Sequence, residues 1–61
     1  MERFLEGQLV LLTGAAKGIG FSTLESLLDS GAKVLATDID SQLLATKSES
    51  LARKYPDQLW V

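Results

Sequence analysis

The residues best suited to chemistry are a short glycine-rich segment and an aspartate further along the chain. The segment follows an apolar run, precedes a helical pattern, and reads Thr13-Gly14-Ala15-Ala16-Lys17-Gly18-Ile19-Gly20. A turn from a strand into a helix offers a phosphate unpaired N–H groups and the positive end of the helix dipole. The segment therefore predicts the pyrophosphate-binding turn of a dinucleotide site.

The three fixed glycines of this turn have separate roles. Gly14 permits a tight turn, Gly18 lets the main chain approach the pyrophosphate, and Gly20 lets the helix pack closely on the strand. A glycine turn without a ligand is the alternative interpretation. A mononucleotide P-loop is excluded, because that motif needs Ser or Thr directly after its Gly-Lys pair, and here Lys17 is followed by Gly18.

Asp38 is the expected acidic partner of the turn. It ends the second predicted strand. Dinucleotide sites carry an acidic residue for the ribose hydroxyls about 20 residues after the glycine turn, and Asp38 lies close to that spacing. Its charge opposes the 2′-phosphate of NADP, so the cofactor expected is NAD, with NADP less favoured. Lys17 is weak evidence for NADP, because a basic residue in the turn can reach a 2′-phosphate. An ordinary turn aspartate and a solvated loop lysine are the alternatives.

Five elements follow from the hydrophobic pattern. Residues 8–13 and 33–38 are apolar runs of strand length, and residues 58–61 resemble the opening of a third strand. Residues 19–29 show helical spacing of apolar positions, and Gly31 is a suitable stop. Asp40 or Ser41 can cap a second helix, which Pro56 ends. The order is β-α-β-α-β.

The apolar strands and the connections together predict an α/β fold with one face uncovered. Right-handed crossovers place both helices on the same side of a parallel sheet. Continuous apolar strands, however, are typical of sheets covered on both faces. We therefore expect residues 1–61 to be the N-terminal portion of a single NAD(P)-binding domain with a doubly wound, Rossmann-type parallel sheet, truncated in its third strand. A small stand-alone protein with an exposed apolar face is the alternative.

Composition excludes several classes of function. The chain has 61 residues, a formal net charge of −2, and neither cysteine nor histidine, so no metal site is expected. Its basic residues are scattered, which argues against nucleic-acid binding. The longest apolar run, 9–12, is too short to span a membrane, and residues 1–7 lack the apolar core of a signal peptide. A cytoplasmic location is expected.

The form Thr-Gly-x-x-x-Gly-Ile-Gly resembles the cofactor signature of the classical short-chain dehydrogenases/reductases. The resemblance covers nearly the whole chain, from Leu5-Glu6-Gly7-Gln8 through the turn to Gly31-Ala32-Lys33-Val34 and Asp38. It implies that Thr13 and Gly14 begin the turn, that Gly18, Ile19 and Gly20 lie along the pyrophosphate and its ribose, and that Asp38 binds the ribose hydroxyls. Ile39 would lie beside the adenine. Simple packing is the alternative for the two isoleucines.

The resemblance also implies an activity that this chain cannot complete. The family transfers hydride between NAD(P) and an alcohol or carbonyl substrate, usually as a homo-oligomer, with a Ser and a Tyr-x-x-x-Lys group. No catalytic residue is predicted in 1–61, because Tyr55 is followed four residues later by Leu59. The expected function is the dinucleotide-binding part of an NAD-dependent oxidoreductase. A non-catalytic dinucleotide-binding module and an inert or interaction fragment are the alternatives.

Overall fold

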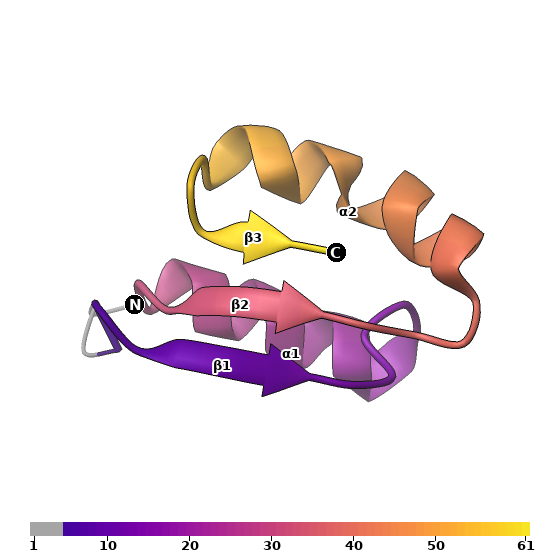
Figure 1. The fold of residues 1–61 in the computed structure, drawn as a ribbon, viewed down its shortest axis with the longest axis horizontal. Helices are drawn as coiled ribbons and strands as arrows, with labels where there is room; N and C mark the ends of the chain where they lie inside the picture. The colour runs from indigo at the N-terminus through magenta and orange to yellow at the C-terminus, as the bar shows by residue number, and fades with distance from the viewer. Residues whose placement is uncertain (1–4) are drawn as a thin grey trace.

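The computed structural model describes residues 5–61; the first four residues of the segment inspected for a signal peptide lie outside them. The elements are β1 (Leu9–Leu12), α1 (Gly18–Asp29), β2 (Lys33–Ala36), α2 (Ser41–Lys54) and β3 (Leu59–Trp60), as Figure 1 shows. The predicted order β-α-β-α-β is confirmed.

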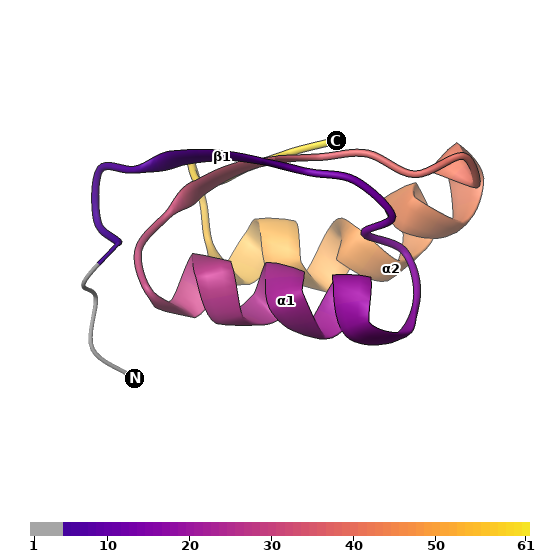
Figure 2. The ribbon, with the colours of Figure 1, turned by 90° about the horizontal axis from the view of Figure 1, so that it is seen from below.

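The three strands form one parallel sheet in the order β1-β2-β3. In the register of the sheet, Leu11 lies beside Leu35, and Leu35 beside Trp60. Figure 2 shows α1 and α2 on the same side of this sheet, as right-handed crossovers require. The expected Rossmann-type arrangement is therefore confirmed over the described residues.

The core lies between the sheet and the two helices. Alternate strand residues point into it, so Val34 and Ala36 are fully buried, whereas their neighbour Leu35 is exposed. Leu24 and Leu28 of α1 meet them from the helical side. Phe21 is half-buried, and the Lys47 ammonium group of α2 lies 4.4 Å from the centre of its ring. The remaining core residues are Ala15, Ala16, Ala32, Leu44, Leu51 and Tyr55.

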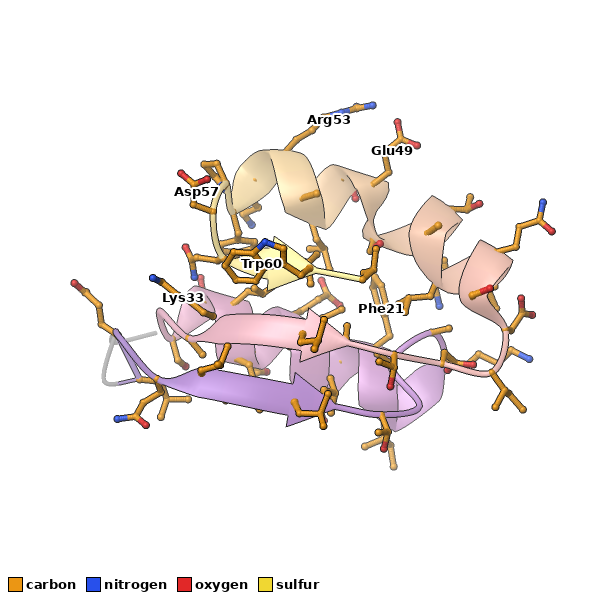
Figure 3. All side chains as sticks on the ribbon, viewed as in Figure 1. Phe21, Lys33, Glu49, Arg53, Asp57 and Trp60 are labelled. Carbon is orange, nitrogen blue, oxygen red and sulfur yellow. The ribbon has the colours of Figure 1, made fainter. Side chains whose placement is uncertain are left out.

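The opposite face of the sheet has no cover among the described residues. Leu9 and Leu11 of β1 expose 74% and 65% of their surface, and Trp60 of β3 exposes 47%. Figure 3 shows the Trp60 ring in front of the sheet, on the side turned away from α1. These exposed side chains confirm the predicted bare face. Folded monomers rarely leave large contiguous apolar surface in water.

The strands are shorter than the apolar runs, and α1 begins one residue earlier than predicted. β1 ends at Leu12 and β2 at Ala36, so Thr13 and Asp38 lie beyond the strand ends. Backbone pairing nevertheless continues: the Thr37 N–H donates to the Leu12 carbonyl at 2.8 Å, and the Ala15 N–H donates to the Thr37 carbonyl at 3.0 Å. These two hydrogen bonds join the segments beyond the strand ends and hold the glycine turn beside the end of β2.

Asp40, one of the two candidate caps, begins α2: its Oδ1 accepts a hydrogen bond from the Leu43 N–H at 3.0 Å. We expect Asp40→Ala to lower the free energy of unfolding by about 1 kcal/mol, the usual loss for a removed helix cap. Urea unfolding followed by circular dichroism measures the change. Ser41→Ala, at the candidate that does not cap, is the matched control and should have a smaller effect; equal losses would contradict the assignment.

Among residues 5–61, neither α1 nor α2 has the length and apolar character that a membrane-spanning helix requires.

Candidate functional site

An open hollow of about 950 Å³ lies where the glycine turn meets the segment after β2. The turn contributes Thr13, Gly14 and Lys17 to its walls. The segment after β2 contributes Thr37, Asp38, Ile39 and Asp40. The carboxyl ends of parallel strands, where this hollow lies, are the usual place for ligands in open α/β sheets. The structure therefore brings most of the predicted site residues together.

Three of the predicted residues lie outside this hollow. Gly18 and Ile19 line a second hollow of about 660 Å³ along α1, together with Leu5 and the hydroxyl side chains of that helix. Gly20 lines neither and packs against the turn itself. All three residues belong to α1, which begins at Gly18, whereas the turn residues that line the first hollow precede the helix.

The backbone of the turn has the form that an anion site needs. Gly14 and Gly18 have φ angles of 64° and 51°, a left-handed conformation that side-chain-bearing residues rarely adopt. The residue that caps α1 is Lys17, which is extended and makes no side-chain hydrogen bond to the helix. Lys17 therefore gives the first N–H groups of α1 no side-chain acceptor, and the first helical turn carries no acidic residue. Such an end fits a phosphate.

Gly20 sits where α1 crosses the turn. A Cβ atom built there would overlap the Gly14 carbonyl oxygen and lie 2.9 Å from the carbonyl carbon. Both atoms belong to the main chain, so neither can rotate aside. The sequence predicted close packing of the helix on the strand at Gly20; in the structure the close approach is to the main chain of the turn, at Gly14.

The Asp38 carboxylate is held by two backbone donors. Its Oδ2 accepts from the Ala16 N–H at 3.0 Å, and its Oδ1 accepts from the Asp40 N–H at 2.9 Å. The bond from Asp40 and then the bond from Ala16 hold the pKa of Asp38 below its ordinary value, opposed by partial burial and supported by the Lys17 charge. Asp38 is therefore an oriented, ionised acceptor at neutral pH.

Lys17 and Ile39 lie at the rim of the hollow. The Lys17 side chain is exposed, and its charge acts on Asp38. Ile39 is fully exposed, and Ile19 exposes 87% of its surface. Neither isoleucine belongs to the core of the described residues, so packing within residues 5–61 does not explain them.

Sequence reasoning missed contributions from Ala16, Thr37 and Asp40. Ala16 takes part through its backbone N–H, and Thr37 through both backbone groups, so neither side chain carries a signal. Asp40 was assigned only as a helix cap, yet it also lines the hollow. Its position two residues after Asp38 is the signal that was available. Within residues 5–61, no three His, Cys, Asp or Glu residues gather as metal ligands would.

No protein-family model matches the chain. The chain is 62% identical over 50 residues to the vibriobactin-specific 2,3-dihydro-2,3-dihydroxybenzoate dehydrogenase of Vibrio cholerae. This match covers 82% of this chain and 19% of that protein. It is 47% identical over 57 residues to a 2,3-dihydroxy-2,3-dihydro-p-cumate dehydrogenase of Pseudomonas putida, covering 93% of this chain and 22% of the other. It is 50% identical over 46 residues to the human L-xylulose reductase, covering 67% of this chain and 19% of the other.

The chain thus spans about a fifth of the length of these relatives, from 19% to 22%. All three are dehydrogenases or reductases by name, and the matched residues cover most of the fold described above. The chain belongs to the short-chain dehydrogenase/reductase family.

Proposed function

We propose that residues 1–61 supply the dinucleotide-binding part of an NAD-dependent oxidoreductase that transfers hydride between a nicotinamide cofactor and an alcohol or carbonyl substrate. The observation that carries the proposal is one hollow lined by the first part of the glycine turn (Thr13, Gly14 and Lys17) and by Asp38, whose carboxylate accepts a hydrogen bond from the turn. The names of the relatives, all dehydrogenases or reductases, support the class of reaction.

Each residue of the turn has a defined role in this proposal. The backbone at Gly14 and Gly18 and the open N–H groups at the start of α1 bind the pyrophosphate. Asp38 accepts hydrogen bonds from the adenosine ribose hydroxyls, and its negative charge disfavours a 2′-phosphate. Ile39, exposed at the rim, lies against the adenine. When bound, the nicotinamide supplies the position that gains or loses the hydride.

We assign no proton-transfer group of the reaction to residues 1–61. Tyr55 is buried against the core, and its hydroxyl donates a hydrogen bond to Asp29 Oδ1 at 3.3 Å. Asp29 is the last residue of α1, and neither residue lines the hollow. We propose that the chain is the N-terminal portion of a larger domain, because relatives are longer and the bare sheet face needs cover. Catalysis, a cytoplasmic location and assembly into a homo-oligomer then belong to that larger protein.

Calorimetry of the purified chain tests the cofactor assignment. We expect NAD to bind weakly, in the micromolar to millimolar range, and NADP more weakly still. Adenosine, which has the ribose but no pyrophosphate, is the ligand control and should bind less tightly than either. Absence of binding heat for NAD at millimolar concentration would contradict the assignment, and tighter binding of NADP would reverse the cofactor preference.

Activity measurements separate an enzyme from a binding module. The 61-residue chain should not reduce NAD in the presence of an alcohol, whereas a longer protein that carries these residues should do so. Absorbance of reduced nicotinamide follows both reactions. Turnover by the short chain would show that it contains its own proton-transfer group, and inactivity of every longer protein would favour the non-catalytic module.

A further inference from the structure

We propose that Asp38 acts before any cofactor binds: its carboxylate holds the glycine-rich turn in the conformation that receives the pyrophosphate. The proposal rests on the function proposed above, and adds a positioning role to the expected ribose contact. Its basis is the hydrogen bond from the Ala16 N–H to Asp38 Oδ2, which joins the turn to the segment after β2. These residues are far apart in the chain and meet only because β1 and β2 pair.

Burial makes this hydrogen bond hard to replace. Ala16 is fully buried, with an exposed fraction of 0%, so water does not reach its N–H group. A buried N–H without a partner is costly, and backbone groups in folded proteins are nearly always paired. The neighbouring Ala15 N–H is bonded to the Thr37 carbonyl, a main-chain contact that involves no side chain. Within residues 5–61, these hydrogen bonds join Ala15 and Ala16 of the turn to the segment after β2, and the one to Asp38 depends on a side chain.

The second carboxylate oxygen fixes the direction of the first. Oδ1 accepts from the Asp40 N–H at 2.9 Å, at the residue that caps α2. The carboxylate is thus anchored at the start of α2 while it reaches the turn. Each carboxylate oxygen has a second lone pair, so ribose hydroxyls can donate to Asp38 without displacing either backbone donor. The cofactor would therefore meet a turn that is already ordered.

Amide hydrogen exchange of the cofactor-free chain tests the proposal. In Asp38→Ala, we expect the Ala16 amide to exchange at least about fivefold faster, the change that follows from losing one hydrogen bond. Asp40→Ala is the matched control: it removes the cap to Leu43 but keeps its own backbone N–H, so exchange at Ala16 should not change. Asp38→Asn, which retains one acceptor oxygen, should restore part of the protection. Unchanged exchange at Ala16 in a folded Asp38→Ala chain would overturn the proposal.

Binding of inorganic pyrophosphate separates positioning from ribose recognition. This probe has no ribose, so a residue that only binds ribose gives it no help. Removing the nearby negative charge should by itself strengthen pyrophosphate binding. We instead expect Asp38→Ala to weaken it, by about threefold or more, because the turn must be ordered on binding. Equal or tighter binding by Asp38→Ala would overturn the positioning role.

The wild-type chain gives a further readout if Asp38→Ala does not fold. The depressed pKa of Asp38 means that its hydrogen bonds are complete above the ordinary pKa of a carboxyl and are lost as the pH falls through the lower, folded-state pKa. The chemical shift of the Ala16 amide should follow that protonation. Lys17 and Asp40 are the charged neighbours, so the same titration in Asp40→Ala identifies Asp38 as the source. An Ala16 signal that does not respond would overturn the proposal.

These measurements need no dinucleotide. A chain in which Ala16 exchange depends on Asp38, but which does not bind NAD, would refute the proposed function and leave the positioning contact intact.

Discussion

Replacement of Gly20 by alanine should lower the free energy of unfolding by about 2 kcal/mol or more, the range for forcing an extra carbon into a packed site. A loss of stability would be informative, because helix propensity alone predicts a gain: alanine is more favourable than glycine in a helix by about 1 kcal/mol. The new methyl group would overlap the Gly14 carbonyl, which belongs to the main chain. Urea unfolding measures the loss, and NAD affinity should fall with it because the turn must shift.

Ser22→Ala is the matched control for Gly20→Ala. It lies in the same helix, two residues further on, and its side chain is exposed. Its effect should be small and tend toward stabilisation, as intrinsic helix propensity alone predicts. If Gly20→Ala were as stable as the parent chain, the close contact between α1 and the turn at Gly14 would be contradicted.

Replacement of Asp38 by asparagine should reverse the preference between the two dinucleotides. The amide keeps the shape of the side chain but removes the charge that accepts ribose hydroxyls strongly and repels a 2′-phosphate. We expect NAD affinity to fall about tenfold, the scale of one charge-assisted hydrogen bond, while NADP affinity rises. Calorimetry with both ligands at constant ionic strength gives the ratio.

Lys17 provides the opposing control for this experiment. Its charge lies beside the same hollow, so Lys17→Met should weaken NADP binding more than NAD binding. In the double variant with Asp38→Asn, the gain in NADP affinity should largely disappear. If the ratio of the two affinities did not change in Asp38→Asn, Asp38 would not be the residue that selects the cofactor.

The sequence was sufficient to predict the elements and the place of the turn, because both depend on local patterns. Apolar runs broken by glycine indicate a strand, a turn and a helix, and Asp38 follows the glycine turn at close to the expected spacing of about 20 residues. The exact ends were less predictable. The predicted strands include Thr13 and Asp38, but in the structure β1 ends at Leu12 and β2 at Ala36.

The contact between Asp38 and Ala16 shows what the sequence could not reveal. Alanine carries no signal for a backbone donor, and its partner lies 22 residues away. The division of the predicted site between two hollows has a similar origin, since it depends on where the first turn of α1 begins. In contrast, the bare sheet face was predictable, because it follows from strand periodicity and the handedness of the crossovers.

A dinucleotide site between the glycine turn and Asp38 can be detected by titrating the isotopically labelled chain with NAD and following every backbone amide signal by NMR. We expect the signals of Gly14, Ala16, Gly18 and Asp38 to shift together with one binding constant, while those of Leu11 and Trp60 on the bare face do not move. Shifts confined to the bare face, or no shift at millimolar NAD, would contradict it.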